Sequence, residues 1–108
     1  MNFYLGYSIE QIDMNDRNVE LNDEMIEYLY SLEKMISFKS FFTIDLYTDT
    51  VLKEKDLIDI ISMCRSLMDE HVLNDYYEKE ALISTIGELS DLCCEAIKQC
   101  KKVIVIGD

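Results

Sequence analysis

Apolar residues recur every three or four positions along three stretches of the chain, the spacing that places them on one face of an α-helix. This pattern predicts helices over residues 23–37, about 54–70 and about 76–101. Asn22, directly before the first stretch, is a residue type that caps helix N-termini, and the two acidic residues after it suit the positive end of the helix dipole. The third helix has the widest apolar stripe, so we expect it to be the most buried.

Two other segments are rich in aromatic or β-branched residues and predict strands, residues 3–12 and residues 103–106. Residues 38–52 contain apolar side chains without a sustained period, and we expect an ordered connector that covers one end of the core. The expected fold is one helix-dominated α+β domain over residues 1–108, in the order β-α-α-α-β. Two short strands are marginal alone, so they should pair with each other against the three-helix core. An edge of this small sheet would remain exposed and able to accept a partner's strand.

Composition limits the partners of this domain. The chain carries 22 acidic and 10 basic residues, a net charge of −12. This balance argues against binding to nucleic acid or to anionic membranes, because both require clustered Lys and Arg. A protein with a basic surface is the complementary partner, although excess acid can also serve only to keep a protein soluble. The first residues do not form a signal segment and the aliphatic run 103–106 is too short to span a bilayer, so we expect a cytoplasmic protein.

The residue types that carry catalysis or bind metals are sparse and poorly placed. The cysteines are Cys64, Cys93, Cys94 and Cys100, with no C-x-x-C pair among them. We interpret all four as small core side chains in a reducing compartment, with a bridge from Cys64 to the third helix left open. The single histidine, His71, is expected at the end of the second helix, where the dipole favours it. The sequence therefore predicts a protein that is not an enzyme and needs no cofactor or metal.

One segment differs from the rest: residues 10–33 hold eight carboxylates and a single basic residue, Arg17. Two tyrosines are interleaved with these acids. Carboxylates orient an incoming basic protein and aromatic side chains anchor it, so the sequence predicts a partner-binding surface here. Its candidate residues are Asp13, Asp16, Glu20, Asp23, Glu24, Glu27, Tyr28 and Tyr30. The alternative is an ordinary solvated helix face with the tyrosines packed at its margin.

Three segments together resemble small acidic immunity proteins, which are encoded beside bacterial polymorphic toxins such as contact-dependent and type VI secretion effectors. The segments are Tyr4-Leu5-Gly6-Tyr7-Ser8-Ile9-Glu10, Val19-Glu20-Leu21-Asn22-Asp23-Glu24 and Val103-Ile104-Val105-Ile106-Gly107-Asp108. The resemblance implies a protein that binds one cognate toxin in the cytoplasm and blocks its active site. It assigns no role to individual residues, because such families share a role more than a motif. Another acidic binding module, either a DNA-mimicking inhibitor or a regulatory adaptor, is the alternative.

Overall fold

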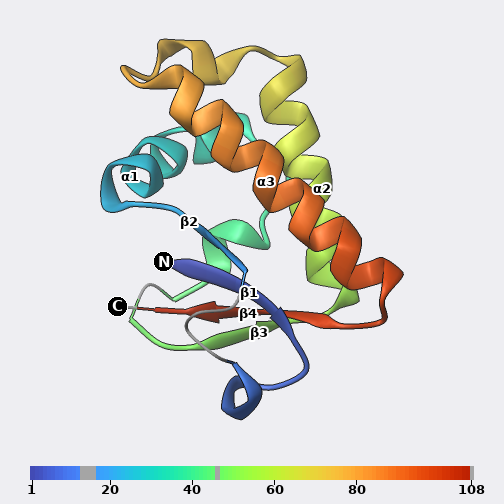
Figure 1. Cartoon of the computed structure of the whole chain (residues 1–108). Coiled ribbons are helices and arrows are strands. Elements are labelled where there is room, and N and C mark those ends of the chain that lie inside the picture. Colours follow the sequence, from blue (N-terminus) through green and yellow to red (C-terminus); the bar gives the residue numbers. More distant parts are fainter. Residues whose placement is uncertain (13–16, 46, 108) are drawn as a thin grey trace.

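The computed structural model describes residues 1–12, 17–45 and 47–107 and has the helix-dominated α+β fold expected from the sequence (Figure 1). The main elements are, in chain order, β1 (Asn2–Gly6), β2 (Asn18–Glu20), α1 (Asp23–Ser31), β3 (Thr50–Leu52), α2 (Glu54–Asp69), α3 (Lys79–Lys98) and β4 (Lys102–Ile106). Short 3-10 turns lie between them: η1 (Ile9–Gln11), η2 (Glu33–Met35), η3 (Phe41–Thr43) and η4 (Val72–Asp75).

The described strands form one antiparallel sheet in the order β2-β1-β4-β3. The two terminal strands, β1 and β4, pair along their whole length, as expected, with Phe3 opposite Val105 and Leu5 opposite Val103. β2 and β3 were not predicted from the sequence, because three residues are too few to show an alternating pattern. These short strands occupy the outer positions, so the edges of the sheet belong to β2 and β3 and not to the terminal pair.

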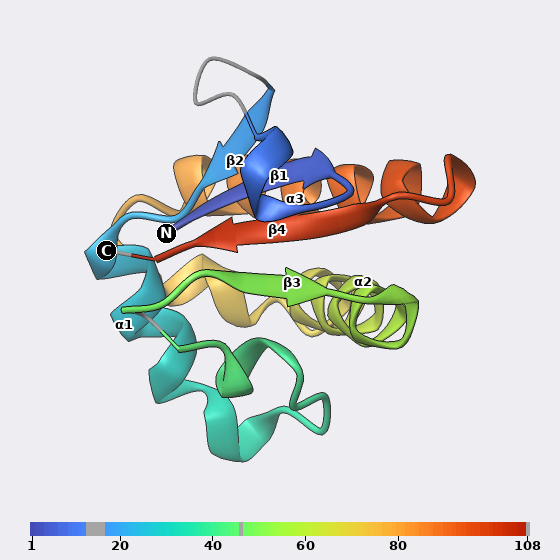
Figure 2. The same ribbon diagram turned by 90° about the horizontal axis from the view of Figure 1, so that it is seen from below.

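Side chains are buried on both faces of the central strands. Figure 2 shows α2 and α3 against one face of the sheet, and Phe3 and Val105 belong to the core cluster on that side. On the other face Tyr4 and Ile104 are also buried. The chain after β1 folds back on this second face: a Cβ on Gly6 would lie only 2.9 Å from Ile12 Cδ1. This return explains why the strand expected over residues 3–12 ends at Gly6.

α1 and the connector after it lie beyond the β3 edge of the sheet in Figure 2. The helix expected to reach residue 37 ends at Ser31, and the backbone then tightens into η2. Leu32 and Ile36 are nevertheless buried, so the apolar spacing was a reliable guide to burial and not to helix length. Within the connector, η3 buries Phe41, and the Ser40 N–H donates to Asp59 Oδ2 of α2 at 2.8 Å.

α3 ends in a pair of backbone hydrogen bonds that closes the helix before β4. The Lys101 N–H donates to the Ala96 carbonyl at 2.8 Å, and the Cys100 N–H donates to the Ile97 carbonyl at 3.2 Å. This pattern is a Schellman motif, and it requires a left-handed residue just after the helix. Cys100 supplies it, with φ 56°, at a position where glycine is the usual residue.

The cysteines do not all occupy the core as expected. All four are free thiols; Cys64 and Cys93 are buried between the helices, whereas Cys94 and Cys100 are exposed. Successive helical residues point about 100° apart, and Cys94 lies beyond the edge of the apolar stripe that buries Leu92 and Cys93. Burial raises the pKa of the Cys93 thiol to about 12 and also raises the pKa of Cys64, which makes both poor nucleophiles.

Candidate functional site

The carboxylates predicted to bind a partner are exposed wherever the structure describes them. Asp13 and Asp16 lie outside the described residues, and Glu20 is exposed at the end of β2. Asp23, Glu24 and Glu27 are exposed on α1. This helix starts where the sequence predicted, because the Asn22 side chain accepts a hydrogen bond of 2.9 Å from the Met25 N–H.

The two tyrosines of the predicted surface are half-buried and take part in packing. The Tyr28 hydroxyl donates to the Val72 carbonyl at 2.5 Å, and its ring lies 5.0 Å from the ring of Tyr76. Burial, and then the charge of Asp75, raise the pKa of Tyr28. The Tyr30 ring packs against Phe41, with the two ring centres 5.8 Å apart. Neither tyrosine is therefore presented as an open anchor for a partner.

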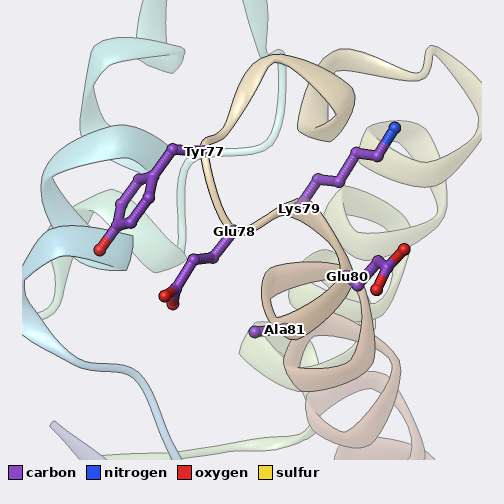
Figure 3. Close-up of a pocket in the computed structure, with 5 residues that line it drawn as sticks. All are labelled: Tyr77, Glu78, Lys79, Glu80 and Ala81. Atoms are coloured by element: carbon purple, nitrogen blue, oxygen red, sulfur yellow. The ribbon is translucent and has the colours of Figure 1, made fainter.

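Tyr77 is the exposed tyrosine beside these acids, with 71% of its surface accessible. Its hydroxyl donates to the Glu24 carboxylate, a contact that joins the start of α3 to α1. Figure 3 shows Tyr77 and Glu78 pointing towards α1, while Lys79 and Glu80 point away from it. The hydrogen bond to Glu24 is the main cause of a raised pKa for the Tyr77 phenol.

This contact defines a continuous surface that sequence reasoning did not identify. The Tyr77 surface, as we call it, comprises Glu24 and Glu27 of α1 with Asp75, Tyr77 and Glu78 at the η4–α3 junction, and all five are exposed. Residues 77–81 also line a hollow of 450 Å³ beside it. The sequence shows an acid-and-tyrosine run at residues 75–78, but nothing in the run indicates that it lies beside α1.

A short stack of tyrosine rings connects this surface to the interior. The Tyr77 ring lies 4.9 Å from that of Tyr76, which in turn contacts Tyr28. Tyr76 is only 6% exposed, and its hydroxyl has no hydrogen-bond partner among the described residues. A buried hydroxyl without a partner costs stability. The position of Tyr77 is therefore set by ring contact with Tyr76 and by the hydrogen bond of its hydroxyl to Glu24.

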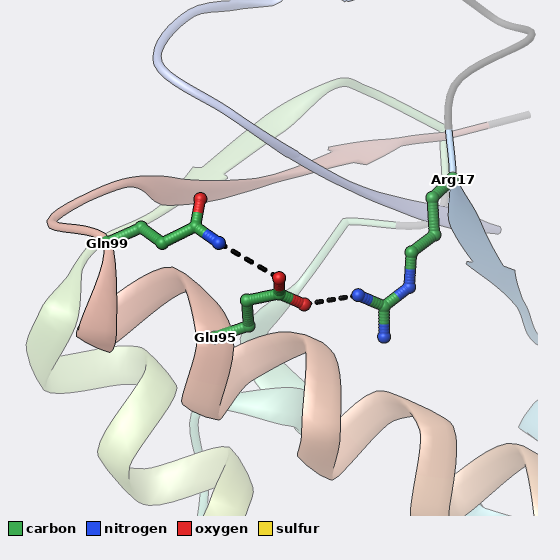
Figure 4. A network of polar contacts seen from close by, with 3 residues as sticks. All are labelled: Arg17, Glu95 and Gln99. Atoms are coloured by element: carbon green, nitrogen blue, oxygen red, sulfur yellow. Dashed lines mark hydrogen bonds and ion pairs between the residues drawn. The ribbon is translucent and has the colours of Figure 1, made fainter.

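Arg17, the only basic residue in the acidic segment, contacts a different part of the molecule. Figure 4 shows its guanidinium paired with Glu95 of α3, whose second carboxylate oxygen accepts a hydrogen bond of 2.9 Å from Gln99 Nε2. The side chains of Arg17 and Glu95 are 55% and 37% exposed, so the pair contributes little to stability. Its consequence is electrostatic: this cation neutralises a carboxylate of α3 and not those of α1.

No three His, Cys, Asp or Glu side chains of the described residues are grouped closely enough to hold a metal ion. His71 is exposed just beyond α2, in a left-handed conformation with φ 57°. No helix in the described part of the chain combines the length and apolarity needed to cross a bilayer. Comparisons of the chain with models of known protein families, with curated proteins and with solved structures found no match.

Proposed function

We propose that this protein is an immunity protein, which binds a cognate bacterial toxin domain through the Tyr77 surface and occludes the toxin's active site. The observation that carries the proposal is the contact between Glu24 and Tyr77. It brings carboxylates of two distant segments around an exposed aromatic ring. Tyrosines are frequent energetic centres of protein interfaces, and surrounding charges orient the approaching partner. The bound toxin domain carries the basic surface that complements these acids.

The placement of the acids supports binding over a role in folding. Exposed side chains of like charge repel one another and contribute little to the stability of the free protein. In a complex, truncating a carboxylate that is buried against Arg or Lys costs about 2–5 kcal/mol, whereas changing a charge at the rim mainly alters the association rate. The Tyr77 surface offers both kinds of residue, with Glu24 beside the ring and Glu27 further along α1.

The test begins with the protein that co-purifies when this chain is expressed from its native operon. A neighbouring gene product with a toxin-like C-terminal domain is the expected partner, and its activity should be lost in the complex. Replacing Glu24 and Glu27 with lysine should weaken this complex at least tenfold and slow association most at low salt. The control carries lysine at Glu10 and Glu88, which are exposed on η1 and α3.

The two double variants change the net charge by the same amount. A difference in affinity between them therefore reports the position of the charges and not the total charge. Equal loss of affinity in both variants would show that the Tyr77 surface is not the interface. A partner that is bound but keeps full activity would exclude the immunity role and favour a regulatory adaptor. Competition between the partner and double-stranded DNA for the same site would instead favour DNA mimicry.

A further inference from the structure

A second candidate site lies between α2 and α3, outside the Tyr77 surface. It is a groove of 240 Å³, lined by residues of both helices. Its accessible apolar lining is Met68 and Gly87, both half-buried, above the fully buried Ile86. Its rim is charged, with Arg65, Asp69 and Asp91 all exposed.

Gly87 lines this groove from the middle of α3. Glycine weakens a helix interior relative to alanine, so a glycine at this position needs a physical reason. Packing within the chain does not provide one: a Cβ at Gly87 would approach only Met68 Cε, at 3.9 Å, an ordinary contact distance. What the missing side chain does provide is depth, because the space beside Met68 that a side chain at position 87 would fill is left open.

We infer that this groove receives a lysine side chain from a protein partner. Methylene groups of such a side chain would lie on Met68 and on the backbone of Gly87, both half-buried, while its ammonium group would reach the carboxylates at the rim. Long cationic side chains commonly bury their apolar stems in this way while keeping the charged end in water. Two carboxylates against one guanidinium leave the rim negative, in keeping with the net charge of −12. This inference is independent of the proposed function.

Small probes with matched side chains test the groove directly in the full chain. The probes are Nα-acetyl-lysine N-methylamide and its norleucine and aminoadipate analogues, which end in a cation, a methyl group and a carboxylate. Amide signals of Met68, Gly87 and Asp91 should shift in a saturable manner with the lysine probe. Its affinity should exceed that of the norleucine probe at least about threefold, the scale of an exposed ion pair. Tighter binding of the aminoadipate probe, or no saturable shift at these amides, would overturn the inference.

Two substitutions show which part of the groove acts. Gly87→Ala should keep or raise the melting temperature and weaken the lysine probe about fivefold or more, because the added methyl occupies the floor. Arg65→Gln should raise the affinity for the lysine probe, because it removes a positive charge that repels the ammonium group. In a groove that binds carboxylates, the same substitution would instead weaken binding of the aminoadipate probe and leave the lysine probe without a gain. Ser84→Ala, on an exposed position of α3 outside the groove, is the control and should change nothing. An unchanged affinity in Gly87→Ala would refute the site.

Discussion

Two pairs of segments that are distant in the sequence meet in this fold, and they meet in opposite ways. β1 and β4 lie side by side at the centre of the sheet, and Phe3, Tyr4, Ile104 and Val105 there are almost completely buried. α1 and the segment before α3 also meet, and the outer part of this junction is the contact between Glu24 and Tyr77, which are exposed. The first meeting removes apolar surface from water and so contributes to folding. The exposed contact between Glu24 and Tyr77 contributes little to folding, which leaves these two residues free to be selected for binding.

Loss of the buried pairing between β1 and β4 should have the largest effect on stability. Deletion of residues 103–108 takes away most of β4, and with it the hydrogen-bonding partner of β1 and three fully buried side chains. We expect the shortened chain to show no cooperative thermal transition by circular dichroism. Deletion of residues 107–108 alone spares β4 and serves as the control. A melting temperature equal to that of the full chain in the longer deletion would disprove the central role of the β1–β4 pair.

The buried thiols should make stability depend on alkaline pH. Burial raises the pKa of Cys93 to about 12 and raises that of Cys64 above its ordinary value of 9.0. The unfolded chain therefore loses these protons first as pH rises above about 9, so the stabilisation present below that pH is progressively lost. At pH 10 each thiol should cost roughly 1 kcal/mol.

Urea unfolding at pH 7 and pH 10 measures this loss. Other groups also titrate in this range, so the informative comparison is with the double variant Cys64→Ala and Cys93→Ala. Its loss between the two pH values should be smaller than that of the wild type by about 2–3 kcal/mol. Cys94→Ser, at an exposed position, should leave the loss as it is in the wild type. An equal loss of stability between pH 7 and pH 10 in the double variant would show that burial does not raise the pKa of these thiols.

A smaller effect, of opposite sign, is expected where α3 turns into β4. Cys100 holds a left-handed conformation that costs a side-chain-bearing residue about 1–2 kcal/mol. Cys100→Gly should therefore raise the free energy of unfolding by about 1 kcal/mol. The same substitution at exposed Cys94, inside α3, should lower it by about 1 kcal/mol. Changes of the same sign at both positions in urea titrations would contradict this account of the helix end.

The difference between the buried β1–β4 pairing and the exposed Glu24–Tyr77 contact also explains which features could be predicted from the sequence. The strand segments of β1 and β4 are strongly apolar, so their burial and pairing followed from composition and pattern. The three helices followed from their apolar spacing. β2 and β3 did not, because three residues carry no usable period and β-pairing depends on neighbours distant in sequence.

The candidate site was less accessible to such reasoning. Exposure of Glu24 and Glu27 could be predicted from their positions on the polar face of α1. The different roles of the tyrosines could not be predicted, because Tyr28 and Tyr77 both lie next to acidic residues in the sequence. Their difference arises from tertiary contacts: Tyr28 donates to Val72 within the packing, and Tyr77 extends towards α1 from the end of η4. No helical or strand period encodes that arrangement.

The smallest effect on stability is expected at the exposed contact between Glu24 and Tyr77. Replacing tyrosine with phenylalanine at position 77, and at position 28 for comparison, measures it. Tyr77→Phe removes a hydroxyl that donates to Glu24 in solvent, and the melting temperature should stay within about 3 °C of the wild type. Tyr28→Phe leaves the Val72 carbonyl without its half-buried donor, so the free energy of unfolding should fall by about 0.5–1.5 kcal/mol. Parallel thermal and urea melts check both. A loss at Tyr77 as large as that at Tyr28 would mean that the Glu24–Tyr77 contact serves folding, and the separation between a buried meeting that stabilises and an exposed one that binds would fail.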